Sequence, residues 1–214
     1  MKTVVISIII AWTSIAYAIA QDYREASPQQ QKQMLQKITE ASSRMKSLAC
    51  DFEQTKELSI LNEKMSSKGR MFYRNDQCVR WEYSTPYAYT FVFNNNRILM
   101  TQADGKQSVT DVKSNNLFQE IVKIMISSID GSGLTDSKSF TSKFFIAGDD
   151  PMVTLTPVRK DVRRMFATIK LFFTAKDYSV DSVVMEESNG DNTTIKLTNK
   201  RYNETINPSL FAIN

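Results

Sequence analysis

The sequence predicts an α+β fold in which one strongly curved, mainly antiparallel sheet of about ten strands is covered on its concave side by helices. Apolar residues alternate with polar residues at a period of two through most of the chain, as in strands with one buried face. Local turns separate these runs, and only two stretches have helical periodicity. A chain of 214 residues has room for one such domain.

The first twenty residues differ in character from the rest of the chain. A positive start at Met1-Lys2 precedes the apolar run Val4–Ile15, and small residues follow up to Ala20. This order is typical of a secretory signal peptide cleaved after Ala20, with Ala18 as the alternative site. The apolar run is shorter than the roughly 20 residues of a membrane span, which disfavours an uncleaved anchor. We expect a single soluble, exported domain over residues 21–214.

The first element of that domain is a helix over residues 28–46. Ser27 is a suitable N-cap, and Pro28 suits the first helical position. Apolar residues then recur at helical spacing at Met34, Leu35, Ile38, Met45 and Leu48. The helix therefore has one face to bury.

Short strands joined by local turns follow this helix and predict an antiparallel meander. The alternating runs are 48–53, 65–73, 79–83 and 89–93. Polar turn residues separate them, and Asn94-Asn95-Asn96 reverses the chain once more.

Two cysteines, Cys50 and Cys78, lie at the beginning of the first strand and after the second. Pairing of these strands as a hairpin would bring the two residues close together, and export permits a disulfide. We therefore expect a Cys50–Cys78 bridge, with two free thiols as the alternative.

A second amphipathic helix is predicted over residues 117–129, where Ile121, Ile124 and Met125 belong to a broad apolar arc. Gly131 and Gly133 end it. Strands resume afterwards at 144–146, 152–157, 164–174, 180–187 and 193–202.

The concave face of the predicted sheet is rich in large apolar and aromatic side chains. Strand parity places on it Phe52, Met71, Tyr73, Trp81, Tyr83, Phe91, Phe93, Met165, Ile169, Leu171 and Phe173. Two interpretations stay open at this point. These side chains pack solidly under the helices, or the helices leave an apolar cavity for a ligand.

Composition argues against most catalytic and nucleic-acid classes. The chain has no histidine, two cysteines and six glycines, so His-based catalysis, ordinary zinc sites and a phosphate-cradling loop are not expected. We expect no cofactor and no metal. The net charge of +4 is interspersed, apart from a basic group at 159–164, and does not indicate nucleic-acid binding. The acid pairs Asp149-Asp150 and Glu186-Glu187 keep a carboxylate hydrolase open as an alternative.

A series of short motifs carries a resemblance to a known family. They are ACDFEQTK at 49–56, SKGRMFY at 67–73, RWEYSTP at 80–86, FVFNN at 91–95, VTLTP at 153–157 and NPSLFAI at 207–213. In this order and spacing they resemble the periplasmic outer-membrane lipoprotein carrier family, LolA, across essentially the whole mature chain.

The resemblance implies an incomplete, half-open β-barrel of about eleven strands whose mouth is covered by helices, with a hydrophobic cavity between them. It implies a monomeric periplasmic carrier rather than an enzyme. Such a carrier takes acylated lipoproteins from an inner-membrane ABC transporter and passes them to an outer-membrane receptor. The lack of a cysteine at the expected cleavage site favours the carrier over the lipid-anchored receptor.

The resemblance also suggests residue roles. It places Trp81 and Phe91 on the cavity wall and the segment with Ile124 and Met125 in a lid. Arg74 is the candidate for a basic residue that holds the lid closed, and a solvated turn charge is the other interpretation of this residue. A lipid-binding or sensor domain on the same half-barrel is the alternative function.

Overall fold

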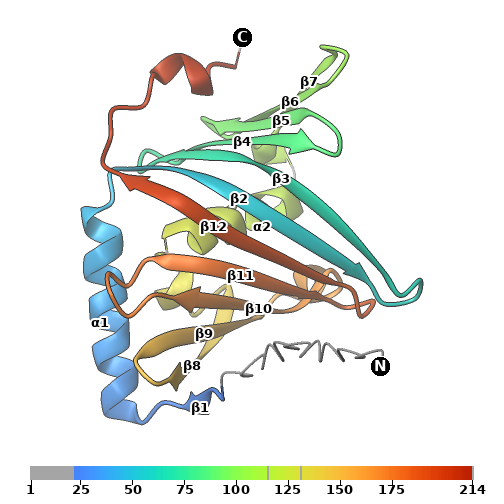
Figure 1. Ribbon diagram of the computed structural model, residues 1–214. Coiled ribbons are helices and arrows are strands. Elements are labelled where there is room, and N and C mark those ends of the chain that lie inside the picture. Colours follow the sequence, from blue (N-terminus) through green and yellow to red (C-terminus); the bar gives the residue numbers. More distant parts are fainter. Residues whose placement is uncertain (1–21, 115, 131, 214) are drawn as a thin grey trace, which may run out of the picture.

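The computed structural model describes residues 22–114, 116–130 and 132–213 (Figure 1). The expected signal peptide lies outside these residues. In chain order the strands are β1 (Arg24–Glu25), β2 (Ser47–Leu58), β3 (Glu63–Arg74), β4 (Cys78–Thr85), β5 (Tyr89–Asn94), β6 (Arg97–Gln102), β7 (Gln107–Asp111), β8 (Phe140–Ala147), β9 (Asp150–Pro157), β10 (Phe166–Phe173), β11 (Val180–Glu187) and β12 (Asn192–Tyr202).

Within the described part of the chain these twelve strands form one sheet in the order β1-β8-β9-β10-β11-β12-β2-β3-β4-β5-β6-β7. All neighbouring strands are antiparallel. The last strand, β12, pairs with β2 and so joins two meanders at the centre of the sheet. The edges β1 and β7 do not pair with each other, so the predicted α+β half-barrel is confirmed as an open sheet. It has twelve strands rather than about eleven, and the additional β1 has only two residues.

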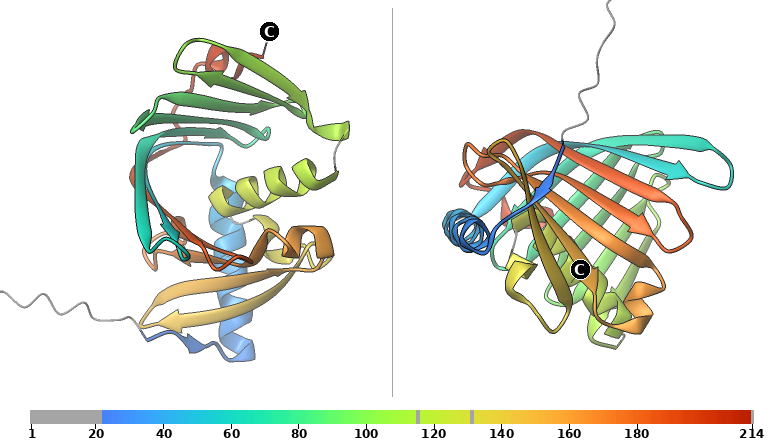
Figure 2. Two further views of the ribbon diagram at one scale, coloured as in Figure 1. Left: turned by 90° about the vertical axis from the view of Figure 1, so that its right-hand side faces the viewer. Right: turned by 90° about the horizontal axis from the view of Figure 1, so that it is seen from below.

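Bulges contribute to the curvature of this sheet. Register shifts occur between Lys68 and Gly69 on β3 and between Thr198 and Arg201 on β12. A bulge bends its strand and increases the local twist. Figure 2 shows the sheet curving around one helix, α2 (Asn116–Asp130). Val122, Ile124 and Ile129 of that helix are buried against the sheet.

Helix α1 (Pro28–Arg44) begins with the predicted cap. The Ser27 hydroxyl accepts a hydrogen bond from the Gln30 backbone N–H, and the Gln30 side chain accepts one from the Ser27 N–H. Met34 and Ile38 are its buried residues. However, α1 runs along one end of the sheet instead of covering its concave face (Figures 1 and 2). The concave face is covered by α2, so the expectation that both helices cover it was wrong.

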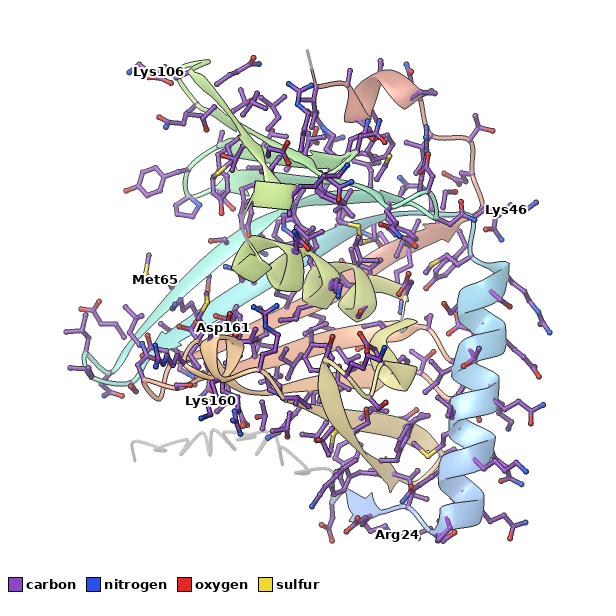
Figure 3. All side chains as sticks on the ribbon, turned by 180° about the vertical axis from the view of Figure 1, so that it is seen from behind. Arg24, Lys46, Met65, Lys106, Lys160 and Asp161 are labelled. Atoms are coloured by element: carbon purple, nitrogen blue, oxygen red, sulfur yellow. The ribbon has the colours of Figure 1, made fainter. Side chains whose placement is uncertain are left out.

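Short helical elements complete the fold: η1 (Val112–Ser114), η2 (Ser132–Thr135), α3 (Lys160–Arg163) and η3 (Pro208–Phe211). The basic group of the sequence forms α3 and its flanks, where Arg159 pairs with Asp161 at 2.6 Å. Lys160 and Asp161 are labelled there in Figure 3. In the described residues, no helix has the length and apolarity needed to cross a bilayer.

The long hairpin of β2 and β3 extends beyond the rest of the sheet (Figure 1). Ile60 and Leu61 at its tip are 85% and 62% exposed. Met65, on the β3 arm, points away from the sheet in Figure 3. These apolar side chains contribute nothing to the core.

Candidate functional site

An apolar cavity of about 400 Å³ lies between α2 and the concave face of the sheet. Ile124, Met125 and Ile129 of α2 form one wall. The sheet supplies the others from β2, β4, β5, β6, β10, β11 and β12, through Gln54, Trp81, Tyr83, Tyr89, Phe91, Met100, Phe166, Val183, Met185, Ile195 and Leu197. None of the described lining residues carries a charge, so the cavity suits an uncharged, mainly hydrocarbon ligand.

A cluster of aromatic rings forms the part of the wall contributed by β4 and β5, and Phe52 of β2 supports it from beneath. The Phe52 ring lies 4.7 Å from that of Trp81 and 4.9 Å from that of Tyr83, between centroids. Tyr83 stacks on Tyr89 at 4.2 Å. Gly69 on β3 makes this cluster possible, because a Cβ at Gly69 would lie 2.8 Å from the Phe52 ring.

The few polar atoms of the cavity come from Gln54, Tyr83, Tyr89 and Trp81. The Tyr83 hydroxyl donates to Gln54 Oε1 at 2.8 Å. Burial and the neighbouring Tyr89 raise the pKa of Tyr83, so its hydroxyl stays protonated and remains a donor. Trp81 Nε1 is buried and has no hydrogen-bond partner.

A second cavity, of about 540 Å³, lies at the end of the sheet beside α1. Leu48, Ile129 and Val180 give it an apolar floor, whereas Lys37, Lys176 and other charged residues line its rim. Ile129 borders both cavities. The buried Tyr202 hydroxyl, which has no hydrogen-bond partner, also lines this second cavity.

The structure divides the predicted concave residues into two groups. Trp81, Tyr83, Phe91, Ile124 and Met125 line the cavity, so their proposed role in ligand binding stays a prediction that the geometry allows. The others pack beneath it as fully buried core: Phe52, Met71, Tyr73, Phe93, Ile169, Leu171 and Phe173. The concave face is therefore solidly packed in one part and lines an apolar cavity in the other. The side chain of Ile121 lies outside the described residues.

Met165 was placed wrongly by strand parity. It precedes β10 and is 37% exposed. The pairing of β10 with β11 shifts register between Phe166 and Thr168, and such a shift reverses which residues face inward. Phe166 therefore lines the cavity in place of Met165.

The predicted bridge between Cys50 and Cys78 is also wrong, since both residues are free. Cys50 pairs with Met71, whereas Cys78 pairs with Arg74, three residues further along β3. An odd offset places two side chains on opposite faces of a sheet. Cys50 accordingly packs in the main core, and Cys78 belongs to a small apolar cluster on the outer face with Val92 and Phe211.

We expect both thiols to be protected in the native protein. Burial raises the pKa of Cys50 to about 12 and that of Cys78 to about 11, so at pH 8 almost no reactive thiolate is present. A thiol reagent should label the native protein slowly and should label both cysteines once the chain is unfolded without reductant. An unfolded, unreduced chain with no reactive thiol would contradict the assignment of free cysteines.

Arg74, the candidate lid latch, forms no hydrogen bond or ion pair with the part of α2 whose side chains the structure describes. Its guanidinium forms an ion pair with Asp76 and lies 5.2 Å from the ring centroid of Phe211. The contact with Phe211 places Arg74 against the C-terminal segment on the outer face. The neighbouring Tyr73 faces inward, and its hydroxyl donates to Asp130 Oδ2 at the end of α2, at 2.9 Å. Tyr73, rather than Arg74, bonds the sheet to the covering helix.

Tyr73→Phe should loosen α2 from the sheet with little loss elsewhere. One hydrogen bond of this kind contributes about 1 kcal/mol. Hydrogen exchange in α2 should therefore be several-fold faster, whereas exchange in β2 and β3 should hardly change. Arg74→Gln is the matched control on the adjacent residue of the same strand, and it should leave α2 unaffected. Equal protection of α2 in wild type and Tyr73→Phe would exclude the bond as a latch.

The acid pairs do not face the cavity. Glu186 accepts hydrogen bonds from Lys170 and Thr168, and Glu187 pairs with Lys56 at 2.8 Å. Burial alone would raise the pKa of Glu186, but the bonds from Lys170 and Thr168 outweigh it and lower the pKa, which does not suit a general acid. Among the residues that the structure describes, no group of three or more Cys, Asp or Glu side chains could hold a metal ion.

Strand pattern could have found most of the lining residues that were missed. Gln54 continues the inward parity of Phe52, and Tyr89 has the parity of Phe91. The same alternation of inward and outward residues identifies the lining residues of β11 and β12, which are Val183, Met185, Ile195 and Leu197. Only the position of α2 distinguishes these residues from those that fill the core.

Comparison with known proteins agrees with this architecture. The family model described as outer membrane lipoprotein carrier protein LolA matches residues 43–214. No curated protein sequence matches the chain significantly.

Several solved structures are similar in fold. An uncharacterised conserved protein from Thermus thermophilus has a TM-score of 0.50 and 8% identity, over 86% of this chain and 94% of that one. A LolA superfamily protein from Nitrosomonas europaea has a TM-score of 0.47 and 6% identity, over 85% and 97%. Lipoprotein LppX from Mycobacterium tuberculosis has a TM-score of 0.47 and 11% identity, over 85% and 99%. At such identities the similarity concerns the fold alone.

Proposed function

Because the chain belongs to the family of outer membrane lipoprotein carrier proteins, LolA, we propose that it is a periplasmic carrier that shields lipoprotein acyl chains in the cavity under α2. The observation that carries this proposal is the uncharged, largely apolar lining of that cavity. Acyl chains require a dry enclosure and no catalyst. Each buried methylene contributes about 0.8 kcal/mol to binding.

The size of the cavity has a consequence for how cargo is held. At about 400 Å³ it lies near the lower end of the roughly 300–1,000 Å³ range of small-ligand pockets. A lipoprotein with several acyl chains needs more space, so α2 must move away from the sheet when cargo enters. Opening would break the bond between Tyr73 and Asp130, and binding would offset its cost.

We propose that a signal peptide over residues 1–20 directs the chain to the periplasm, where it acts as a monomer. An inner-membrane ABC transporter would deliver the lipoprotein, and an outer-membrane receptor would accept it.

Trp81 provides a direct test of binding, because its ring lies in the cavity wall. Its emission should change on addition of a lipopeptide and should not respond to the same peptide without acyl chains. Trp81 is the only tryptophan of residues 21–214, so the emission of the mature protein reports on Trp81 alone, and the variant Trp81→Phe should give no such signal. Identical responses to the two peptides would contradict the proposal.

A further inference from the structure

The cavity combines an apolar lining with one buried donor that makes no hydrogen bond. Trp81 is 8% exposed and lies in a row of paired residues across the sheet: Cys50, Met71, Trp81, Phe91 and Met100. Within the described residues, the only buried side-chain nitrogen or oxygen atoms without a partner are Trp81 Nε1 and the Tyr202 hydroxyl. Each of these residues lines one of the two cavities.

An unpaired buried donor is costly. Leaving such a group without an acceptor costs about 1–3 kcal/mol, and most buried polar groups in proteins are therefore paired. An indole N–H can only donate, and its ring cannot rotate the proton toward another acceptor as a hydroxyl can. The Tyr202 hydroxyl can rotate its proton toward another acceptor, whereas the Trp81 N–H cannot. Of the two groups, Trp81 Nε1 therefore has the stricter requirement for an acceptor at a fixed position.

The neighbouring polar groups leave the Trp81 donor unused. Tyr83 donates its own proton to Gln54. The Trp81 indole is close enough to the Tyr83 hydroxyl to influence the pKa of Tyr83, but the two groups do not reach hydrogen-bond geometry. Trp81 Nε1 has almost no accessible surface while α2 is closed, so a ligand acceptor can reach it only when α2 moves away from the sheet as cargo enters.

We propose that Trp81 Nε1 donates a hydrogen bond to an ester or amide carbonyl of the bound acyl chain. This inference rests on the proposed function and deepens it, because it specifies the chemical class of the cargo's linkage. Among the residues that the structure describes, no lining residue has a charge that could neutralise a carboxylate, and burying an unpaired carboxylate is costly. The site therefore favours ester- or amide-linked acyl chains over free fatty acid anions and over alkyl ethers.

The test compares three ligands in the wild-type chain and in Trp81→Phe. They are a peptide with a diacylglyceryl-cysteine, its dialkyl ether analogue of equal chain length, and palmitate. Displacement of an apolar fluorescent probe measures binding without relying on tryptophan emission. The ester should bind wild type about 2- to 10-fold more tightly than the ether, the range expected for one hydrogen bond, and palmitate should bind most weakly. In Trp81→Phe the ester and the ether should bind equally.

This two-by-two comparison isolates the pair formed by the N–H and the carbonyl. If the ratio of ester affinity to ether affinity is the same in wild type and in Trp81→Phe, the inference is overturned, whereas the binding of acyl chains is not. Failure of both the ester and the ether to bind would overturn the proposed function, and the inference with it. If Trp81→Phe does not fold, the indole N–H resonance of Trp81 in the wild type replaces it. That resonance should move downfield with the ester and not with the ether, and equal shifts would overturn the inference.

Discussion

Met125→Glu is expected to lower the affinity for a lipopeptide by at least about tenfold while the protein remains folded. Met125 lies on α2, lines the cavity and is half-buried. A glutamate there places a carboxylate against the hydrocarbon of the ligand, and burying an unpaired charge costs several kcal/mol or forces its protonation. Without ligand the helix can turn the carboxylate toward solvent, so stability should fall much less than affinity. Titration with a lipopeptide and a urea denaturation curve measure the two quantities.

Met165→Glu is the matched control, because it makes the same substitution outside the cavity. The side chain of Met165 is 37% exposed and does not line the cavity. This variant should bind the lipopeptide as tightly as wild type does. If both glutamate variants lose affinity equally, general charge rather than the cavity wall governs binding, and the location of the site is wrong.

Gly69→Ala is expected to destabilise the fold by about 3 kcal/mol or more, a value at the upper end for overpacked sites. A Cβ at Gly69 would lie 1.8 Å from the Glu82 backbone oxygen and 2.8 Å from the Phe52 ring. The first contact requires β3 and β4 to separate at their bulge, and the second displaces a ring that supports Trp81 and Tyr83. The midpoint of urea denaturation should fall accordingly.

Ser66→Ala is the control, because it places alanine at an exposed position of the same strand. It should change stability by less than about 0.5 kcal/mol. A Gly69→Ala protein as stable as Ser66→Ala would show that β3 and β4 separate at this point without cost. The aromatic cluster would then not depend on the glycine.

The sequence predicted the faces of the sheet well wherever strand parity is unbroken. The alternation from Phe52 onward and from Ile169 to Phe173 follows the pleat, so each residue is assigned by counting. The same counting failed at Met165, because the register shift at the beginning of β10 reverses parity. Such a shift is a property of paired strands and has no signature in one strand alone.

The cysteine pairing failed for a related reason. Proximity along a hairpin can be inferred from sequence, but a disulfide also requires both side chains to lie on the same face of the sheet. Cys50 pairs with Met71 and Cys78 with Arg74, three residues further along β3, so the two side chains lie on opposite faces. The hydrogen bond between the sheet and α2, from Tyr73 to Asp130, also depends on tertiary structure. Tyr73 and Arg74 are adjacent, and only the position of Asp130 shows which of them contacts the helix.

The division of the concave residues between core and cavity could not be predicted either. An inward Leu171 and an inward Leu197 look alike in the sequence, but one is fully buried core and the other borders the cavity. The difference arises from where α2 crosses the sheet. Helix placement involves contacts between residues far apart in the chain, which local periodicity does not encode.

Photo-crosslinking with a lipopeptide whose acyl chain ends in a diazirine shows whether the acyl chain lies in the cavity under α2. Crosslinks are expected at cavity residues such as Met100, Phe166 and Leu197. These crosslinks should disappear with excess unlabelled lipopeptide and in Met125→Glu. Specific crosslinks at the exposed hairpin tip, Ile60 and Leu61, with none in the cavity, would contradict binding under α2.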